Sequence, residues 1–435
     1  MARGRVVAGI DVGTNKVCTI IASIDPETDK MNVVGVSAHP SAGLRKSQVV
    51  DLEDTIGAVT ESVEAAERMA GYTIVDAFVS ISGAHIQSQN SKGVVAVSEP
   101  EGEITPEDIE RVIEAAKALS LPSSEDVLHV IPRDYKVDSQ GGIKDPLGMT
   151  GVRLEAEVHV ITATTTAMRN LAKCVGEVGI NVNSLIFTGL ASSQAVLTET
   201  ERELGVVLVD IGAGTTSVAI YVEGALMYSS VIPVGARNIT NDLAIGMRVS
   251  LTSAEKIKLA LSEQEKRPVS AEKTDEDILK RKREEDKLDL TKLGIKEELK
   301  TASKKTLVEG IIRPRLNEIF TLIGKEIKKA EAIGLTPAGV VITGGGAQTV
   351  GVVDSCKRVL SLPARVGSPK GLFGLVEEIQ EPIFATATGL ILHAKGNTQP
   401  VRRRVNLEGI GNVMSRIPLK GAVSKVTQLI KSLLP

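Results

Sequence analysis

The chain has 435 residues, of which 42% are hydrophobic and 24% are charged, and its formal net charge is −3. This length favours at least two domains, and this balance is that of an ordinary globular protein. The small net charge gives no general attraction to nucleic acid, and an aromatic content of 2% leaves few side chains to stack on bases. Composition therefore argues against a nucleic-acid-binding protein and predicts an aliphatic core of buried strands covered by helices.

The cysteines and the N-terminal segment indicate a compartment. Cys18, Cys174 and Cys356 lie far apart without a Cys-x-x-Cys spacing, which is typical of free thiols in a reducing environment. The apolar stretch near the N-terminus is broken at Asp11, too early for a signal peptide. No run approaches the roughly 18 apolar residues of a membrane span. We therefore expect a cytoplasmic protein.

One pattern, a strand followed by an Asp-x-Gly turn and another strand, occurs twice in the chain. The turns lie at 11–16 and 210–216. Strands are expected at 6–10, 17–24 and 33–36 in the first copy, and at 206–209, 218–222 and 226–234 in the second. Because each turn joins neighbouring strands, both copies are predicted to be hairpins within a meander. Two such copies predict a duplicated α/β fold with a cleft between its halves.

A segment of different character, 83–163, separates the two copies. Strand-like pieces occur at 93–97, 127–131 and 156–162. A helix is expected to begin after Thr105 as N-cap, because Pro106 and the acidic residues that follow favour the first helical turn. This segment is predicted to be an inserted α+β subdomain.

The second half contains a charged segment and then returns to regular structure. Residues 263–294 are dense in mixed charge, which is typical of a solvated helix or mobile excursion. Amphipathic helices are expected at 307–330, and a strand at 340–342. The triplet Gly344-Gly345-Gly346 follows this strand and is predicted to open a helix.

Two aspartates are the strongest candidates for chemistry. Asp11 and Asp210 each end an apolar strand just before a turn that contains glycine. Such a carboxylate can hold magnesium, usually through water, and a glycine-containing turn lets backbone N–H groups approach phosphate. Lys16 and the hydroxyls of Thr14, Thr215 and Thr216 would then reach the β- or γ-phosphate. One Asp-x-Gly turn alone is more often a structural hairpin turn, but two matching copies and a later glycine triplet favour a phosphate site.

Two further features have alternative interpretations. The glycine triplet allows backbone approach to adenine or phosphate, and equally allows a flexible strand-to-helix turn. Glu255 and Lys258 share one face of a helix expected to begin at Thr252 or Ser253, where they would contact ribose hydroxyls or form an exposed i,i+3 pair. Neither a GxGxxG dinucleotide fingerprint nor a P-loop sequence is present.

The ordered set of motifs resembles the actin/Hsp70/sugar-kinase ATPase superfamily, and within it the bacterial cell-division family FtsA. Segments 11–16 and 210–216 are similar to its two phosphate motifs, 340–347 to its adenosine motif, and 189–197 and 382–389 to its two connecting helices. The resemblance implies ATP and magnesium as cofactors, with Asp11 and Asp210 near the metal. It implies these nucleotide-contacting residues: Asp11, Gly13, Thr14, Asn15, Lys16, Asp210, Gly212, Ala213, Gly214, Thr215, Thr216, Gly235, Glu255, Lys258, Gly344, Gly345 and Gly346.

The second phosphate motif departs from the pattern of the family. FtsA proteins usually have Asp-Ile-Gly-Gly-Gly-Thr-Thr-Asp, whereas this chain has Ala213 for the middle glycine and Ser217 for the final aspartate. A methyl group at Ala213 is expected to crowd the γ-phosphate loop. Rapid hydrolysis is therefore more doubtful than binding, and the activity expected is slow or absent hydrolysis.

The C-terminal segment has an amphipathic pattern. Its apolar helical face consists of Val423, Val426, Leu429, Ile430, Leu433 and Leu434, flanked by Lys425 and Lys431. Such a stripe suits an anionic bilayer surface, and it also suits docking on the protein's own body or on a partner. The basic linker before it, and the position where FtsA has its membrane-targeting helix, favour the membrane.

The resemblance further implies a division of the chain and a role. The expected parts are 1–82, the first actin-like half; 83–165, the inserted subdomain; 166–204, the rest of the first half; 205–240, the second half; 241–306, a smaller subdomain; 307–393, the second half continued; 394–418, a linker; and 419–435, the membrane-targeting helix. The expected role is a scaffold at the cytoplasmic side of the membrane, peripheral and at the division site. Its partners would be the FtsZ C-terminal tail, copies of itself in filaments, the anionic membrane and later division proteins.

Two rivals share the fold. A pilus assembly scaffold of the PilM type would lack the terminal amphipathic helix. A sugar kinase would need an aspartate base facing the cleft, and none stands out in the sequence. A chaperone of the Hsp70 type is disfavoured because no substrate-binding domain follows 389.

Overall fold

The structure is a computed structural model that describes residues 5–98, 102–265, 286–295, 297, 300–375 and 377–396. The chain divides into one compact unit up to Gly396 and a second unit from Asn397 onward. The second unit lies outside the described residues, as do the predicted helix at 419–435 and nearly all of the predicted linker. No helix among the described residues has the length and apolar character needed to span a membrane.

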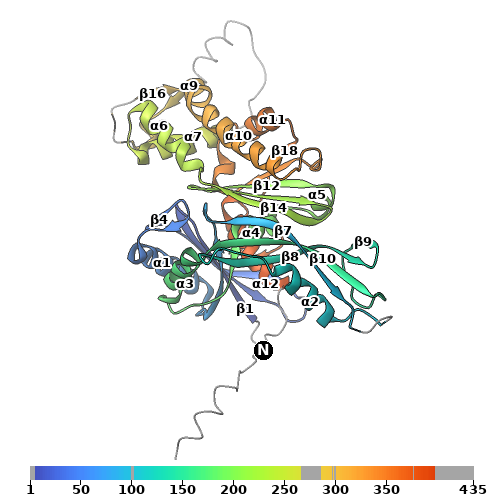
Figure 1. Ribbon diagram of the computed structural model, residues 1–435. Coiled ribbons are helices and arrows are strands. Elements are labelled where there is room, and N and C mark those ends of the chain that lie inside the picture. Colours follow the sequence, from blue (N-terminus) through green and yellow to red (C-terminus); the bar gives the residue numbers. More distant parts are fainter. Residues whose placement is uncertain are drawn as a thin grey trace, which may run out of the picture. The chain divides into compact units, whose positions relative to one another are not determined.

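The first half is built on a six-stranded sheet with the order β11-β6-β1-β2-β3-β19 (Figure 1). Its strands are β1 (Arg5–Val12), β2 (Lys16–Ile24), β3 (Met31–Pro40), β6 (Asp76–Ile81), β11 (Asn181–Phe187) and β19 (Phe373–Gly374). The first three strands form the predicted antiparallel meander, and β6 lies parallel to β1 and β11. Alternate residues face opposite sides, so Ile21 packs with α1 (Leu52–Ala70) whereas Ile20 packs with α12 (Ala385–Gly396).

The second half repeats this arrangement on a five-stranded sheet with the order β14-β13-β12-β17-β18. Its strands are β12 (Val206–Ile211), β13 (Thr216–Val222), β14 (Ala225–Ile232), β17 (Val340–Thr343) and β18 (Ala364–Val366). β12, β13 and β14 pair antiparallel, and β17 lies parallel to β12, as β6 does to β1. The predicted duplication of an actin-like α/β fold is confirmed.

Two helices cross between the halves. They are α4 (Thr188–Val196), which occupies the first segment predicted to connect the halves, and α12, which begins inside the second predicted segment and extends beyond it. At their crossing, a Cβ added to Gly389 would lie 1.8 Å from the carbonyl oxygen of Ala191. Only a glycine allows backbones to approach this closely. Since α12 continues to Gly396, the expected linker does not begin at 394: its first three residues are helical.

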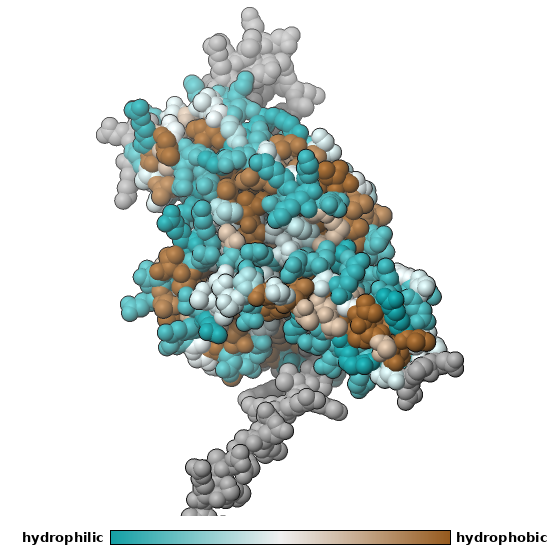
Figure 2. Space-filling model, in the orientation of Figure 1, coloured by the Kyte–Doolittle hydropathy of each residue, from teal (hydrophilic) through white to brown (hydrophobic). Residues whose placement is uncertain are grey.

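The inserted segment forms its own four-stranded sheet with the order β7-β10-β8-β9. Its elements are β7 (Gln87–Ala96), α2 (Pro106–Lys117), β8 (Glu125–Val137), β9 (Gln140–Ile143) and β10 (Arg153–Thr164). Helix α2 begins as predicted: the Thr105 hydroxyl accepts from the Asp108 N–H, and the Asp108 carboxylate accepts from the Thr105 N–H. Figure 2 shows hydrophobic residues exposed towards the end of this subdomain. Between β9 and β10, Leu147 and Val152 are each 52% exposed.

The inserted sheet also contacts the open edge of the second sheet, since β7 lies beside β14 (Figure 1). Ser88 Oγ donates to the Ser229 carbonyl (2.7 Å), and Asn90 Nδ2 donates to that of Met227 (3.2 Å). Buried His159 joins them, with Nδ1 2.7 Å from Asn90 Oδ1 and Nε2 3.0 Å from Ser229 Oγ. Side chains thus satisfy backbone groups that an edge strand leaves unpaired.

The rest of the second half is mainly helical. Its elements are α6 (Ala236–Met247), α7 (Leu251–Glu265), β15 (Lys287–Asp289), β16 (Thr301–Ser303), α9 (Lys304–Leu307), a π-helical turn at Val308–Ile312, α10 (Arg313–Lys329) and α11 (Val352–Leu360). The predicted solvated excursion at 263–294 is wrong at its end, because Leu288 and Leu290 are buried in the core of this half. The two leucines stand among many charged residues, so the composition of the segment hid their burial. Residues 266–285 lie outside the described residues.

Short elements complete the fold. They are β4 (Leu44–Arg45), β5 (Gln48–Val49), α5 (Glu199–Leu204) and the 3₁₀ turns η1 (Thr291–Leu293), η3 (Gly345–Gln348), η4 (Glu377–Ile379) and η5 (Pro382–Phe384). Of these, η3, η5 and the turn between β4 and β5 line the cavity described next.

Candidate nucleotide-binding site

The two aspartates occupy equivalent places in the two hairpins. Asp11 pairs with Cys18 across β1 and β2, and Asp210 pairs with Ser217 across β12 and β13. Each turn closes in the same way, with a glycine N–H donating to a carbonyl three residues later: Gly13 to Lys16 at 3.0 Å and Gly212 to Thr215 at 2.9 Å. The sequence repeat is therefore also a geometric repeat.

Both turns line a single cavity between the halves. Of the residues expected to contact nucleotide, the cavity is lined by Asp11, Gly13, Thr14, Asn15, Lys16, Asp210, Gly212, Ala213, Thr215, Glu255, Lys258, Gly344, Gly345 and Gly346. These residues come from the β1–β2 hairpin, the β12–β13 hairpin, α7 and the turn after β17, four segments distant in the sequence. The fold thus places 14 of the 17 expected residues around one space.

Three of the expected residues do not line the cavity. Thr216 is fully buried in β13, where its hydroxyl donates to the carbonyl of Val234 (2.8 Å). Gly214 packs against the first half: a Cβ there would lie 2.7 Å from Thr14 Oγ1. Gly235 is the N-cap of α6, and a Cβ there would lie 2.6 Å from the Ala213 carbonyl. All three are packed against other parts of the protein around the turn. A sequence motif alone does not distinguish residues that pack in this way from residues that face the cavity.

The carboxylates of the cavity are buried and influence each other. Ser80 Oγ donates to Asp11 Oδ1 (2.6 Å), and Thr386 Oγ1 donates to Asp210 Oδ2 (3.1 Å). Burial raises the pKa of Asp11, and burial together with the negative charge of Asp11 raises the pKa of Asp210 to about 6. Two carboxylates that repel each other favour a cation between them. No group of three or more metal-ligating His, Cys, Asp or Glu side chains occurs among the described residues. A hard divalent cation that is held by two carboxylates would keep several of its waters.

Lys16 lies at the same end of the cavity, on the first half. Its Nζ donates to the carbonyl of Ile383 (2.6 Å) and sits 4.4 Å from the centre of the Phe384 ring. Both contacts belong to the turn η5 that precedes α12. The first phosphate turn is thereby joined to a connecting helix between the halves.

Gly344 requires a glycine for two reasons. Its φ of 81° and ψ of 174° are open almost only to glycine, and a Cβ there would lie 2.2 Å from Asp210 Oδ1. The triplet therefore packs directly on the second aspartate. It opens the 3₁₀ turn η3, whereas the sequence predicted a helix, and the α-helix α11 begins only at Val352.

Glu255 and Lys258 are not the exposed pair that spacing alone favours. Lys258 is only 8% exposed, and its Nζ donates to Glu255 Oε2 (2.8 Å) and Thr240 Oγ1 (2.9 Å). Helix α7 begins at Leu251, earlier than expected, because Ser250 Oγ accepts from the Ser253 N–H (3.2 Å). A charged pair held against the cavity wall can offer hydrogen bonds to a hydroxylated ligand.

Ala213 fits the turn without backbone strain. It is absent from the non-glycine residues with positive φ, so a side chain is compatible with its backbone conformation. The other departure, Ser217 in β13, is also accommodated, since its Oγ lies 3.2 Å from Ser82 Oγ in the first half. The backbone of the turn therefore accepts alanine, and the crowding of a γ-phosphate by its methyl group stays a prediction.

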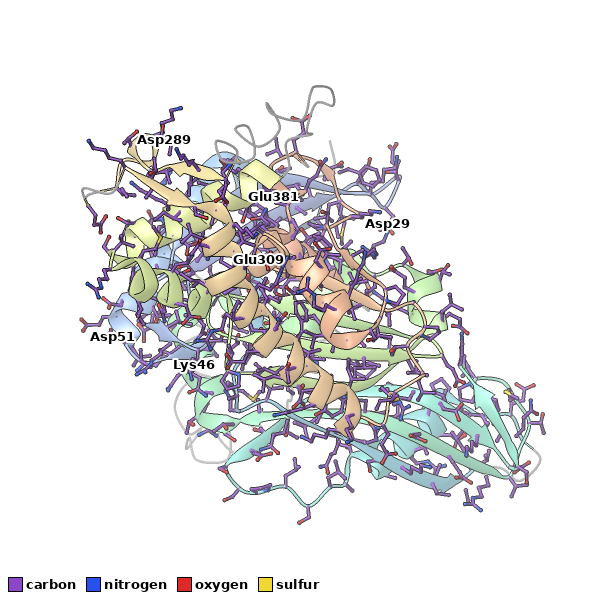
Figure 3. All side chains as sticks on the ribbon, turned by 90° about the horizontal axis from the view of Figure 1, so that it is seen from above. Asp29, Lys46, Asp51, Asp289, Glu309 and Glu381 are labelled. Atoms are coloured by element: carbon purple, nitrogen blue, oxygen red, sulfur yellow. The ribbon has the colours of Figure 1, made fainter. Side chains whose placement is uncertain are left out.

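Several residues of the cavity escaped sequence reasoning, among them Ser47, Ser82, Arg237, Ser262 and Gln348. Ser47 links the two turns: its N–H donates to Thr14 Oγ1 (2.9 Å), and its Oγ lies 3.0 Å from Thr215 Oγ1. No local motif marks Ser47. At the cavity edge, Gln348 donates to Glu381 Oε2 (3.0 Å), and Figure 3 labels Glu381.

Comparison with known proteins places this architecture in a family. A family model described as the SHS2 domain inserted in FtsA matches residues 83–162, and one described as cell division protein FtsA matches residues 207–389. The chain is 38% identical to the cell division protein FtsA of Pseudomonas aeruginosa over 390 residues, covering 90% of this chain and 89% of that protein. It is 37% identical to FtsA of Escherichia coli over 402 residues, covering 90% of each.

Solved structures support the fold. The PilM–PilN type IV pilus biogenesis complex contains a chain with a TM-score of 0.61 and 16% identity, covering 89% of this chain and 98% of that one. MreB5 of Spiroplasma citri bound to ADP gives a TM-score of 0.50 with 13% identity, covering 90% and 97%. At such low identity these likenesses establish the actin-like fold alone. With the inserted subdomain, the duplicated sheets and the sequence matches taken together, the chain belongs to the FtsA family of actin-like cell-division proteins.

Proposed function

We propose that the chain binds ATP with magnesium in this cavity, and that it acts as a scaffold tethering FtsZ filaments to the cytoplasmic membrane at the division site. The observation that carries the nucleotide assignment is the convergence of Asp11 and Asp210 on one cavity. Each comes from the same point of a repeated hairpin, which is an arrangement suited to a metal–phosphate group shared between two halves.

The residues around the cavity fit the parts of the ligand. Asp11 and Asp210 would hold magnesium through its waters, and the bound metal would neutralise phosphate charge. Lys16 and the turn N–H groups other than those of Gly13 and Gly212 would face the phosphates. Glu255 and Lys258 would face the ribose, and Gly344–Gly346 the adenosine. Since no candidate general base stands out, we propose that hydrolysis is slow or absent and that bound ATP mainly holds the halves together.

A titration tests the nucleotide assignment. A fluorescent ATP analogue should bind the wild-type protein in magnesium and weaken at least tenfold in EDTA. Asp11→Asn should reduce the dependence on magnesium, because an amide is a poorer ligand for a hard cation. Asp29→Asn is a matched control, since this exposed carboxylate lies outside the cavity. Binding that is equal with and without magnesium would contradict the metal assignment.

The tethering role rests on family membership and on the C-terminal sequence. The apolar stripe from Val423 to Leu434, with Lys425 and Lys431, would lie in the interface of an anionic bilayer. One short amphipathic helix binds reversibly, so filament formation would strengthen attachment through multivalency. We propose that the FtsZ tail docks on the subdomain at 241–306, and that the assembled scaffold recruits later division proteins.

Liposome sedimentation tests the tether. Full-length protein and a truncation after Asn412 are mixed with anionic or neutral vesicles, with and without ATP. We expect the full-length chain to pellet with anionic vesicles, to bring FtsZ with it, and to pellet more completely with ATP. Equal pelleting of the truncated chain would end the membrane proposal and leave the nucleotide proposal untouched.

A further inference from the structure

The charged side chains around the proposed nucleotide cavity differ in whether they already have partners within the protein. Its described lining contains three acidic and three basic side chains: Asp11, Asp210, Glu255, Lys16, Lys258 and Arg237. A nucleoside triphosphate carries about four negative charges. Its phosphates are therefore best stabilised beside a basic side chain whose N–H donors are not already used by the protein.

Two of the cations are already engaged. Lys16 donates to the Ile383 carbonyl and covers the Phe384 ring, and Lys258 is buried against Glu255 and Thr240. Arg237 differs, because its side chain is exposed and makes no hydrogen bond or ion pair within the described part of the chain. Among the basic residues that line the cavity, Arg237 is therefore the one whose side-chain N–H donors have no partner in the described part of the chain.

The backbone fixes the position of Arg237 beside the second phosphate turn. The N–H of Arg237 donates to the Ala213 carbonyl (2.9 Å), and the N–H of Ala236 donates to that of Gly212 (2.9 Å). The N–H of Asn238 donates to Gly235 (3.1 Å). The first three backbone N–H groups of α6 therefore already donate to carbonyls of the protein. An anion at this helix end would be bound by the Arg237 side chain and not by free backbone groups.

The direction of α6 orders the sites along the cavity. Thr240, one turn after Arg237 and on the same helix face, contacts the pair Glu255 and Lys258 on the neighbouring α7. Arg237 therefore lies on the side of that pair that faces the phosphate turn. The two phosphate turns meet at this end, where Ser47 bridges Thr14 and Thr215.

We infer that Arg237 binds the terminal phosphate of ATP and makes the protein distinguish ATP from ADP. This inference rests on the proposed function and adds a ligand group to it. A guanidinium offers two parallel N–H donors to phosphate oxygens in a planar fork, which an ammonium cannot match. Bound ATP would thereby join the start of α6 to the phosphate turns, and ADP would leave Arg237 without its ligand.

The test is a direct titration of ATP and ADP, in magnesium, against wild-type protein, Arg237→Ala and Arg237→Lys. Loss of a charge-assisted hydrogen bond should weaken ATP binding about 10- to 100-fold in Arg237→Ala. ADP binding should change by less than about threefold, and Arg237→Lys should recover part of the ATP affinity. Arg358→Ala is the matched control, because Arg358 is an exposed helical arginine of the same half outside the cavity.

The outcomes separate this inference from the function beneath it. If wild-type protein binds ATP and Arg237→Ala binds both nucleotides as tightly, the inference is wrong and the nucleotide site stands. Equal weakening of ATP and ADP would move Arg237 to an inner phosphate and overturn its role in discrimination. If wild-type protein binds neither nucleotide, the proposed function fails and the inference fails with it. Thermal unfolding of each variant confirms that the titrations compare folded proteins.

Discussion

Replacing Asp210 with asparagine should make the nucleotide-free protein more stable at pH 8 while weakening magnesium-dependent ATP binding. Asp210 is 5% exposed, and burial together with the charge of Asp11 raises its pKa from 3.8 to about 6. At pH 8 the folded protein therefore holds a carboxylate whose ionised form is unfavourable there. An amide of the same shape removes that charge.

The magnitude follows from the pKa shift. A change of about 2 pKa units at ~1.4 kcal/mol each corresponds to ~3 kcal/mol against the folded state when the group is ionised. Asparagine loses part of this gain, because its NH₂ group cannot accept the bond from Thr386, and one such bond contributes ~1 kcal/mol. A net stabilisation of ~1–2 kcal/mol at pH 8 is expected.

The effect depends on pH with a definite sign. Because the pKa of Asp210 is higher in the folded than in the unfolded protein, the folded state binds more protons between about pH 4 and 6. Wild-type stability therefore falls as pH rises through this window, and the loss is complete above it. The advantage of Asp210→Asn should be largest at pH 8 and decrease towards pH 5.

Urea unfolding in EDTA at pH 5, 6, 7 and 8 measures this difference for wild type and Asp210→Asn. Asp76→Asn serves as control, since Asp76 is an exposed carboxylate at the start of β6. A variant less stable than wild type at pH 8, or one with the same advantage at every pH, would refute the claim that a buried ionised carboxylate lowers stability. The stabilised variant should also need more magnesium to bind ATP.

Three further changes test close packing, helix capping and a buried polar contact elsewhere in the fold. Gly389→Ala should destabilise the protein by at least ~2–3 kcal/mol in urea unfolding, because its methyl group would overlap the Ala191 carbonyl where α4 and α12 cross. Thr105→Ala should cost ~1–2 kcal/mol, since the cap of α2 and the hydroxyl donor to Asp108 are lost together. His159→Ala should cost ~2–3 kcal/mol, and should speed hydrogen exchange in β7 and β14, because the buried polar contact between the sheets loses its central group.

Matched variants make these outcomes specific. Gly57→Ala lies in the middle of α1 with open space around it, so it should stabilise the protein by ~0.5–1 kcal/mol where Gly389→Ala destabilises it. Glu107→Ala, in the same first turn of α2 as Asp108, should cost less than ~1 kcal/mol. His39→Ala, at a partly exposed contact with Glu61, should stay within ~0.5 kcal/mol. If a variant and its control change stability by the same amount, the cause stated for that variant is wrong.

The sequence alone determined the features that repeat or are local. The strands around both Asp-x-Gly turns and the cap of α2 follow from apolar periodicity and from residues within a few positions of each other, whereas the connecting helices were expected from the family resemblance. The correspondence of Asp11 and Asp210 also follows from the sequence, because a duplicated fold places equivalent residues at equivalent points. These signals are short-range, so no knowledge of the tertiary contacts was needed to find them.

Only the tertiary structure decided which side chains face the cavity and which face the core. It placed Thr216 in the core and buried Leu288 within a charged segment, and it brought Ser47 and Arg237 to the phosphate turns. Such placements depend on contacts between residues far apart in the chain, and the local sequence does not record them. The physical reason is that burial belongs to the packed assembly, whereas periodicity and capping belong to single elements.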